Sequence, residues 1–308
     1  MVLPDERSLA LLGPALARHA LAKHARWHFP SVSQHSGRTL LEPMQTETSS
    51  RASPVVEALG VRASGVLSLV GGLGVLLVDI LRRVVRRDFD RNELFRNLHR
   101  MGIKSLPIVT VTALFTGGIM VIQAAPIVQR YGAYGLLGWG AGFGTLREIA
   151  PLLTALMING RVGANNTAEL GTMAVTEQID ALRALAIDPV GFLVAPRFLS
   201  IVVTLFLSTI FSDALALLGA AYAGAGFLGV EPGVFYRGLT TGLLGFGDVA
   251  HGLAKSVVFG AVIGLSSCHF GLSTSGGAPG VGRSVNATVV VSAAGIFVLD
   301  YLLSFALA

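Results

Sequence analysis

The stretch "RVGANNTAELGTMAVTEQIDALRALAIDPV", from Arg161 to Val190, is a polar block between two long apolar stretches. Apolar residues dominate positions 136–160 before the block and 198–223 after it. Each stretch has at least the roughly 20 residues that a helix needs to cross the hydrocarbon core of a bilayer. The sequence therefore predicts two membrane-spanning helices joined by a polar loop.

The composition of the whole chain is that of a membrane protein. Its 308 residues are 52% hydrophobic and 13% charged, whereas a soluble domain carries about 25% charged residues. The mean hydropathy is +0.67. Three further apolar stretches, 106–125, 252–270 and 285–307, bring the predicted spans to five. The predicted fold class is an all-α polytopic membrane protein.

The basic residues lie mainly beside apolar stretches, which is where Lys and Arg orient a membrane protein or meet anionic lipid. We therefore expect no nucleic-acid partner, although the net charge is +5. The segment from Arg82 to Lys104 is densely basic, and Arg161, Arg183, Arg197 and Arg283 fall in the loops after the second and fourth spans. This bias predicts a cytoplasmic N-terminus, a cytoplasmic polar block and a C-terminus outside.

Two segments precede the first span. Residues 1–55 are polar and are predicted to be a disordered extension, without the apolar core of a secretory signal. Residues 56–308 form one predicted membrane domain, which begins with an interfacial element over 65–104. Apolar and basic side chains alternate at helical spacing around 89–100, which is typical of an amphipathic helix lying in the membrane interface.

Within the polar block, residues 176–187 predict a short amphipathic helix. Apolar and charged side chains recur on different faces: Ile179, Leu182 and Leu185 against Glu177, Asp180 and Arg183. Asp188-Pro189 ends the pattern, because the residue before a proline is driven away from helical backbone angles. A helix this short is not stable alone. It is either an ordinary solvated loop helix or a helix that packs against a partner.

Arg147 and Glu148 interrupt the second span. A charge at the centre of a spanning helix costs about 2.5–3.5 kcal/mol, so such residues usually face a cavity or a partner of opposite charge. The two neighbours point about 100° apart on a helix and cannot simply pair with each other. We expect them either to border a cavity or to form structural ion pairs, with Asp213 or Asp300 as partners for Arg147.

The segment from Leu146 to Ser200 resembles the core signature of the MlaE/YrbE permease family, the membrane subunits of Mla- and Mce-type ABC transporters that move lipids across cell envelopes. The matching elements occur in order and without gaps: Arg147-Glu148, Pro151, Gly160-Arg161-Val162-Gly163, Ala168-Glu169-Leu170-Gly171, Thr176-Glu177-Gln178-Ile179-Asp180, Asp188-Pro189 and Pro196-Arg197. A looser resemblance extends from about residue 88 to the end of the chain.

The resemblance implies a role for each part of this segment. The loop helix becomes a coupling helix that docks into a groove on a cytoplasmic P-loop ATPase, through Thr176, Glu177, Gln178, Ile179, Asp180, Leu182 and Arg183, with Ile179 and Leu182 filling the groove. Arg147, Glu148 and Leu152 become candidates for a lipid cavity at the centre of a homodimer. The loop is shaped by Gly160, Arg161, Gly163, Glu169, Asp188 and Pro189, and Arg161 and Glu169 are too far apart along a helix to touch.

The implied partners are the ATPase, an MCE-domain substrate-binding protein, a second copy of this chain and a lipid, in a bacterial inner membrane. No G-x-x-x-x-G-K-[ST] pattern occurs, so ATP is expected on the partner and no cofactor on this chain. Cys268 and His269 have no further ligands nearby, and no nucleophile–base pattern suggests an enzyme, so neither a metal nor a catalytic residue is expected. An ion-coupled transporter that uses Glu148, Asp213 and Asp300 as a relay is the alternative function.

Overall fold

The computed structural model describes residues 54–306 apart from 88 and 241–243. For residues 54–63 and 66 it describes the backbone alone. The predicted extension, residues 1–55, lies almost wholly outside the described residues. Helices make up all the regular structure described, which confirms the all-α prediction. Five of them are long and apolar enough to cross a membrane: Arg91–Tyr131, Tyr134–Val175, Val190–Leu228, Phe246–Leu272 and Gly277–Ala306.

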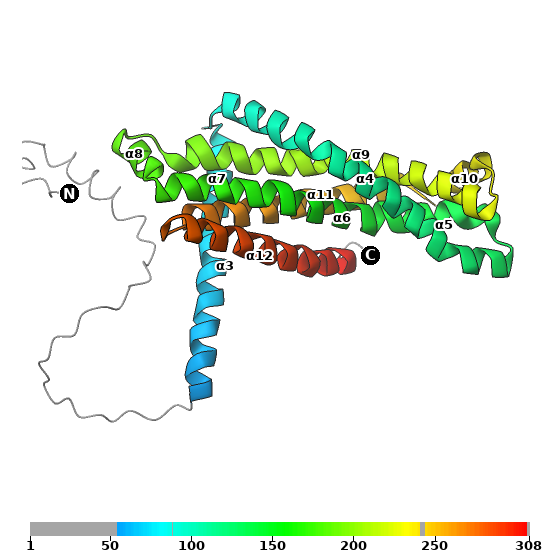
Figure 1. Ribbon diagram of the computed structural model, residues 1–308, viewed down its shortest axis with the longest axis horizontal. Coiled ribbons are helices and arrows are strands. Elements are labelled where there is room, and N and C mark those ends of the chain that lie inside the picture. The colour runs from blue at the N-terminus through cyan, green and yellow to red at the C-terminus, as the bar shows by residue number, and fades with distance from the viewer. Residues whose placement is uncertain (1–53, 88, 241–243, 307–308) are drawn as a thin grey trace, which may run out of the picture. The chain divides into compact units, whose positions relative to one another are not determined.

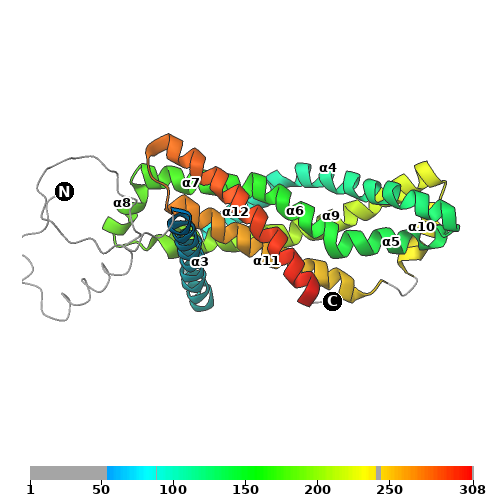
Figure 2. The same ribbon diagram turned by 90° about the horizontal axis from the view of Figure 1, so that it is seen from below.

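The long helices other than α3 run along one bundle, and α3 runs across it (Figure 1). Figure 2 shows α12 crossing α11 obliquely, so that the C-terminal part of α12 lies beside the N-terminal part of α11. The elements are α3 (Pro54–Arg86), α4 (Arg91–Tyr131), η1 (Tyr134–Leu136), α5 (Leu137–Gly144), η2 (Thr145–Ile149), α6 (Ala150–Ile158), η3 (Asn159–Gly163), α7 (Ala164–Val175), α8 (Gln178–Ala184), η4 (Val190–Val194), α9 (Ala195–Leu228), α10 (Pro232–Leu239), α11 (Phe246–Leu272) and α12 (Gly277–Ala306).

The second span is a continuous run of helical segments from Tyr134 to Val175, interrupted by two π-helical turns, η2 and η3. A third π-helical turn, η4, opens the third span. Short π-helical turns inside α-helices are rare and frequently mark functional sites. All three lie within the segment from Leu146 to Ser200 or overlap its start, so the quoted sequence signature and the irregular helix geometry coincide.

The predicted interfacial element over 65–104 is divided between two helices. α3 ends at Arg86, and α4 begins at Arg91, where the side chain of Asp90 accepts hydrogen bonds from the backbone of Asn92 and Glu93. The prediction of a separate amphipathic helix around 89–100 is therefore wrong. That segment is the polar first part of α4, whose 41 residues extend about 60 Å and exceed the roughly 30 Å hydrocarbon core.

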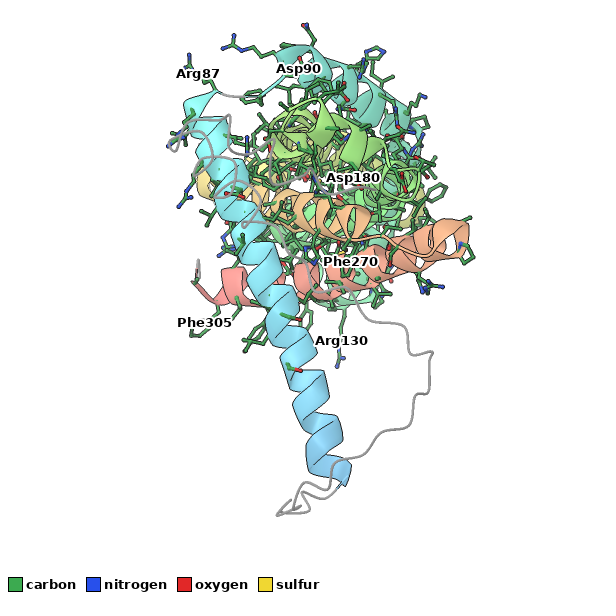
Figure 3. All side chains as sticks on the ribbon, turned by 90° about the vertical axis from the view of Figure 1, so that its left-hand side faces the viewer. Arg87, Asp90, Arg130, Asp180, Phe270 and Phe305 are labelled. Carbon is green, nitrogen blue, oxygen red and sulfur yellow. The ribbon has the colours of Figure 1, made fainter. Side chains whose placement is uncertain are left out.

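α3 lies across the bundle at the end that carries α8, as the view from that end shows (Figure 3). Its Leu76 and Ile80 are buried in a cluster with Leu170 and Phe198, and Arg83 forms an ion pair with Asp188. α3 is not among the five candidate spans found in the described residues. Its transverse course is the one expected of a helix in the membrane interface.

Small residues bring α4 and α9 into close contact. A Cβ atom on Gly117 of α4 would overlap the carbonyl oxygen of Ala216, and one on Gly219 of α9 would overlap the carbonyl oxygen of Leu114. Membrane helices depend on such close approach because lipid is as apolar as the side chains and drives no hydrophobic association. The backbones of the first and third spans are therefore in direct van der Waals contact at this crossing.

We expect Gly219→Ala to destabilise the protein by about 1–3 kcal/mol, because the added methyl forces α4 and α9 apart. The matched control is Gly226→Ala on the same helix, where a Cβ atom meets nothing within 4 Å. Thermal unfolding in detergent measures both. Equal unfolding midpoints for the two variants would contradict the close crossing.

Candidate functional site

The polar block contains a seven-residue helix, α8, which is shorter than the predicted 176–187. Glu177 precedes it with φ 59° and Ala186 follows it with φ 58°. Left-handed backbone costs a residue with a side chain about 1–2 kcal/mol, so both ends of α8 are strained. Strain of this kind persists where the surrounding structure imposes it, and it clusters at functional sites.

α8 has an anchored face and an exposed face. Ile179 is 4% exposed, and Leu182 is half-buried against a cluster that includes Leu170 and Phe198. Leu185 is 71% exposed, and Asp180 and Arg183 form an exposed ion pair at 2.8 Å. The prediction that Ile179 fills a groove on a partner is therefore wrong, because this side chain holds α8 on its own bundle.

The exposed residues on and beside α8 include the other predicted coupling residues and one that was not predicted. Thr176, Glu177, Gln178, Asp180 and Arg183 are all exposed. Leu185 is the additional residue. Helical spacing alone placed it with Ile179 and Leu182, and only the end of α8 at Ala184 turns it outward.

The loop residues fall into two groups. Gly160, Arg161 and Gly163 lie in the π-helical turn η3, where a Cβ atom on Gly163 would press on Ile263 of α11. Asp188 accepts a hydrogen bond from the backbone of Gly191 at 2.7 Å and pairs with Arg83, while Pro189 precedes η4. Asp188 thus joins α3, the loop and the start of the third span.

Glu169 on α7 is the centre of a second polar contact. It forms ion pairs with Arg197 of α9, at 3.1 Å, and with Arg100 of α4. The amide of Asn165 also donates to it, at 2.8 Å. Arg197 is 6% exposed and donates to Asn166 as well. Its two ion pairs join α7 to α4 and α9, so Glu169 ties three spans together at one level.

A charged cluster lies inside the bundle between the second, fourth and fifth spans. Lys255 of α11 is fully buried, and its ammonium group donates to Asp300 at 2.9 Å, to the hydroxyl of Ser304 at 2.7 Å and to Glu148. Ser304 in turn donates to Glu148 at 3.1 Å. Lys255 was not predicted as a site residue, because it stands one residue before an uncharged run, within the predicted fourth span.

Arg147 pairs with Asp248 of α11 at 3.3 Å, and its guanidinium lies 5.4 Å from the ring centre of Phe143. The prediction of Asp213 or Asp300 as its partner is therefore wrong. Asp300 is bound to Lys255, and the carboxylate of Asp213 makes no hydrogen bond within the described residues. The ion-pair interpretation of this region holds, with partners that the sequence did not indicate.

The π-helical turn η2 and a glycine make this cluster possible. η2 carries both Arg147 and Glu148, and a Cβ atom on Gly252 of α11 would overlap the carbonyl oxygen of Leu146. Asp248 and Lys255 are seven residues apart on α11, which is two helical turns, so they present opposite charges to η2 on one face. Because η2 and α11 lie this close together, the side chains of Arg147 and Glu148 both reach α11.

Leu152, the third candidate for a lipid cavity, is half-buried and packs on the core cluster that contains Ile158 and Phe259. A cavity at the centre of a homodimer involves a second copy and stays a prediction, as does the expectation of no cofactor. Among the described residues, no group of three or more His, Cys, Asp or Glu is placed to hold a metal ion.

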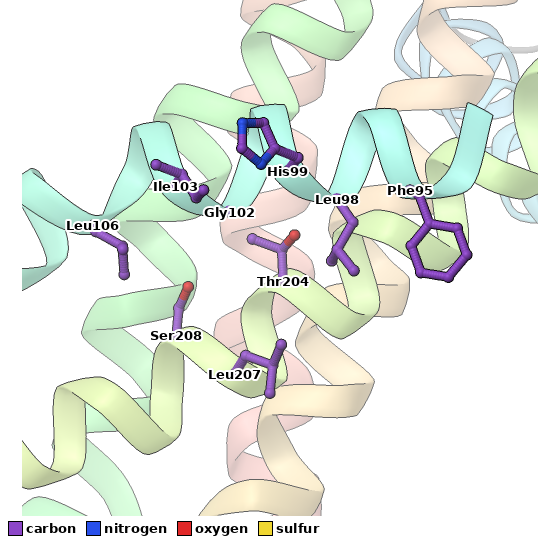
Figure 4. Close-up of a pocket in the computed structure, with 9 residues that line it drawn as sticks. All are labelled: Phe95, Leu98, His99, Gly102, Ile103, Leu106, Thr204, Leu207 and Ser208. Carbon is purple, nitrogen blue, oxygen red and sulfur yellow. The ribbon is translucent and has the colours of Figure 1, made fainter. Parts of the chain in front are cut away.

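An open, mainly apolar groove of about 390 Å³ lies between α4 and α9 (Figure 4). Its lining consists of Phe95, Leu98, His99, Gly102, Ile103, Leu106, Thr204, Leu207 and Ser208. The hydroxyl oxygen of Thr204 is buried there without a hydrogen-bond partner among the described residues. This groove could not be predicted from the sequence, because its lining comes from two helices about 100 residues apart.

Comparison with known proteins points to one family. The family model described as "Permease MlaE" matches residues 94–306, which is more than half of the chain. A probable ABC transporter permease protein of Synechocystis sp. is 35% identical over 227 residues, covering 74% of this chain and 86% of that protein.

Two further relatives have more specific names. Protein TRIGALACTOSYLDIACYLGLYCEROL 1, chloroplastic, of Arabidopsis thaliana is 32% identical over 76% of this chain and 67% of its own length. The intermembrane phospholipid transport system permease protein MlaE of Haemophilus influenzae is 28% identical over 81% of this chain and 95% of its own length.

We expect Lys255→Met to destabilise the protein by about 3–5 kcal/mol, because it removes a fully buried cation and leaves Glu148 and Asp300 without their shared partner. The variant Glu148→Gln/Lys255→Met/Asp300→Asn removes all three charges and should recover most of the loss. Thermal unfolding in detergent compares them. A single variant as stable as wild type would show that the cluster does not hold the spans together.

Proposed function

Because the chain belongs to the MlaE permease family, we propose that it is the membrane-spanning subunit of an ABC transporter that moves phospholipids or related lipids between membranes of the cell envelope. It is an integral membrane protein and a transport component, not an enzyme. As an ABC transporter permease it works with a separate ATPase subunit. The observation that carries the proposal is the family match over residues 94–306.

The arrangement of charge in the spans supports a lipid as the substrate. An acyl chain gains about 0.8 kcal/mol per buried methylene, so its path must be apolar. The charges of the second, fourth and fifth spans are turned toward one another, with Lys255 bound by Glu148 and Asp300 and Arg147 bound by Asp248. Their pairing leaves other surfaces of the spans apolar.

The structure gives less support to the alternative, an ion-coupled transporter. A relay needs its carboxylates within reach of one another. Glu148 and Asp300 both bind Lys255, while Asp213 of α9 makes no hydrogen bond with either in the described residues. Asp213 is thus not connected to the other two carboxylates of the proposed relay.

We infer that α8 is the coupling helix that receives the motion of the ATPase. Ile179 anchors it to the bundle, and Glu177, Asp180 and Leu185 are left exposed. α8 connects the end of the second span to η4 at the start of the third, so a displacement of α8 acts on both spans. ATP binding that favours one arrangement of the partner would then shift the balance between two arrangements of the spans.

The same proposal includes the orientation and the remaining partners. α8, which carries Arg183, and the start of α12, which carries Arg283, lie at the end of the bundle where α9 begins (Figure 1). Excess Lys and Arg favour the cytoplasmic side. We propose a cytoplasmic N-terminus, an external C-terminus, a second copy of the chain and an MCE-domain protein that continues the lipid path outside.

We expect Glu177→Lys/Asp180→Lys to abolish ATP-dependent lipid transfer, because it reverses the charge of the face that α8 offers to the ATPase. The buried anchor Ile179 is untouched, so the variant should still insert and fold. The measurement is co-purification of a P-loop ATPase with the tagged chain from native membranes, followed by lipid transfer between vesicles.

The control is Glu231→Lys, an exposed charge reversal outside the loop, before α10. It should retain the ATPase and the transfer activity. If the double variant retains both as well, α8 is not the coupling helix. If wild type itself recovers no ATPase under gentle conditions, the proposed transporter assembly is wrong.

A further inference from the structure

A polar pocket of about 360 Å³ lies between α4, η3 and α7. We call it the basic pocket. It is lined by Arg100, Met101, Lys104, Ser105, Arg161, Val162, Asn165 and Glu169. It is separate from the charged cluster around Lys255 and from the exposed face of α8, and neither the family match nor the names of the relatives assign it a role.

The basic pocket has an excess of positive charge. Its lining holds three cations and one carboxylate, and that carboxylate, Glu169, is already shared by Arg100 and Arg197. No ion pair joins Lys104 or Arg161 to a carboxylate within the part of the chain that the structure describes. Both side chains are exposed, so the basic pocket presents unpaired positive charge at the surface of the bundle.

The depth of the basic pocket in the membrane follows from the sequence. Lys104 is the last charged residue before the uncharged run 105–129 of the first span, and Arg161 is the first after the uncharged run 149–160 of the second. Both cations thus stand where an apolar span meets water. This boundary is the level of lipid phosphates, and basic pockets between spanning helices are recurrent sites for lipid headgroups.

We propose that the basic pocket binds the phosphate of an anionic phospholipid headgroup, with Lys104 and Arg161 as its direct ligands and Arg100, held by Glu169, at its side. Met101 and Val162, which belong to the buried core, form the apolar floor of the basic pocket. A zwitterionic headgroup brings its own cation into an already positive site, so a headgroup with net negative charge is preferred. This inference does not depend on transport or on an ATPase.

The test titrates purified full-length chain in detergent with phosphatidylglycerol, with phosphatidylcholine and with inorganic phosphate, and reads binding by native mass spectrometry. We expect wild type to prefer phosphatidylglycerol. A basic residue near the membrane surface contributes about fivefold in affinity for an anionic lipid, so Lys104→Gln/Arg161→Gln should weaken this binding about 25-fold.

Two further variants separate the site from general charge and from misfolding. Arg86→Gln/Arg91→Gln removes the same charge from exposed residues outside the basic pocket and should bind like wild type. Lys104→Arg/Arg161→Lys keeps the charge and should bind within a few-fold of wild type.

Three results would overturn the proposal. They are equal affinity of wild type for the two lipids, equal weakening by the two charge-removing variants, and binding of inorganic phosphate that displaces the lipid at equal concentration. The last result would identify a site for a soluble phosphate.

Discussion

The constraint on which the bundle depends is the high free energy of an unpaired charge inside a membrane. Lys255 is fully buried, and Glu148 and Asp300 neutralise it from two other spans. Arg147 and Asp248 add a second pair between the same helices. Because a shift of one residue along any of these spans would separate the charges, the pairs fix the register of the second, fourth and fifth spans.

The remaining spans are held by different interactions. α4 and α9 meet through Gly117 and Gly219, where backbone touches backbone and no charge is involved. At the end that carries α8, Glu169 joins both helices to α7 through Arg100 and Arg197. The bundle thus has ion pairs within the spans, others around Glu169 near their boundary, and backbone packing between α4 and α9 at Gly117 and Gly219.

Composition and periodicity were enough to predict five spans and a polar loop, because the membrane imposes apolar runs of a minimum length. The helix boundaries were predicted less well, since helices continue through charges that end an apolar run, as at Lys104 and Asp248. The partner of Arg147 could not be predicted, because Asp248 is about 100 residues away and only the fold brings it near. The packing of Leu182 could not be predicted either, because its partners include Leu170 and Phe198, which lie outside α8.

α7 gives the proposed sites a physical connection. This helix of 12 residues, about 18 Å long, begins beside the basic pocket and ends at the loop that holds α8. A helix is stiff along its axis, so a displacement of α8 that moves α7 also moves Glu169 relative to Arg100 and Arg197. Any weakening of those ion pairs would free Arg100 for an anion in the basic pocket. By the same contacts, an anion bound there would compete with Glu169 and alter the position that α7 and α8 prefer.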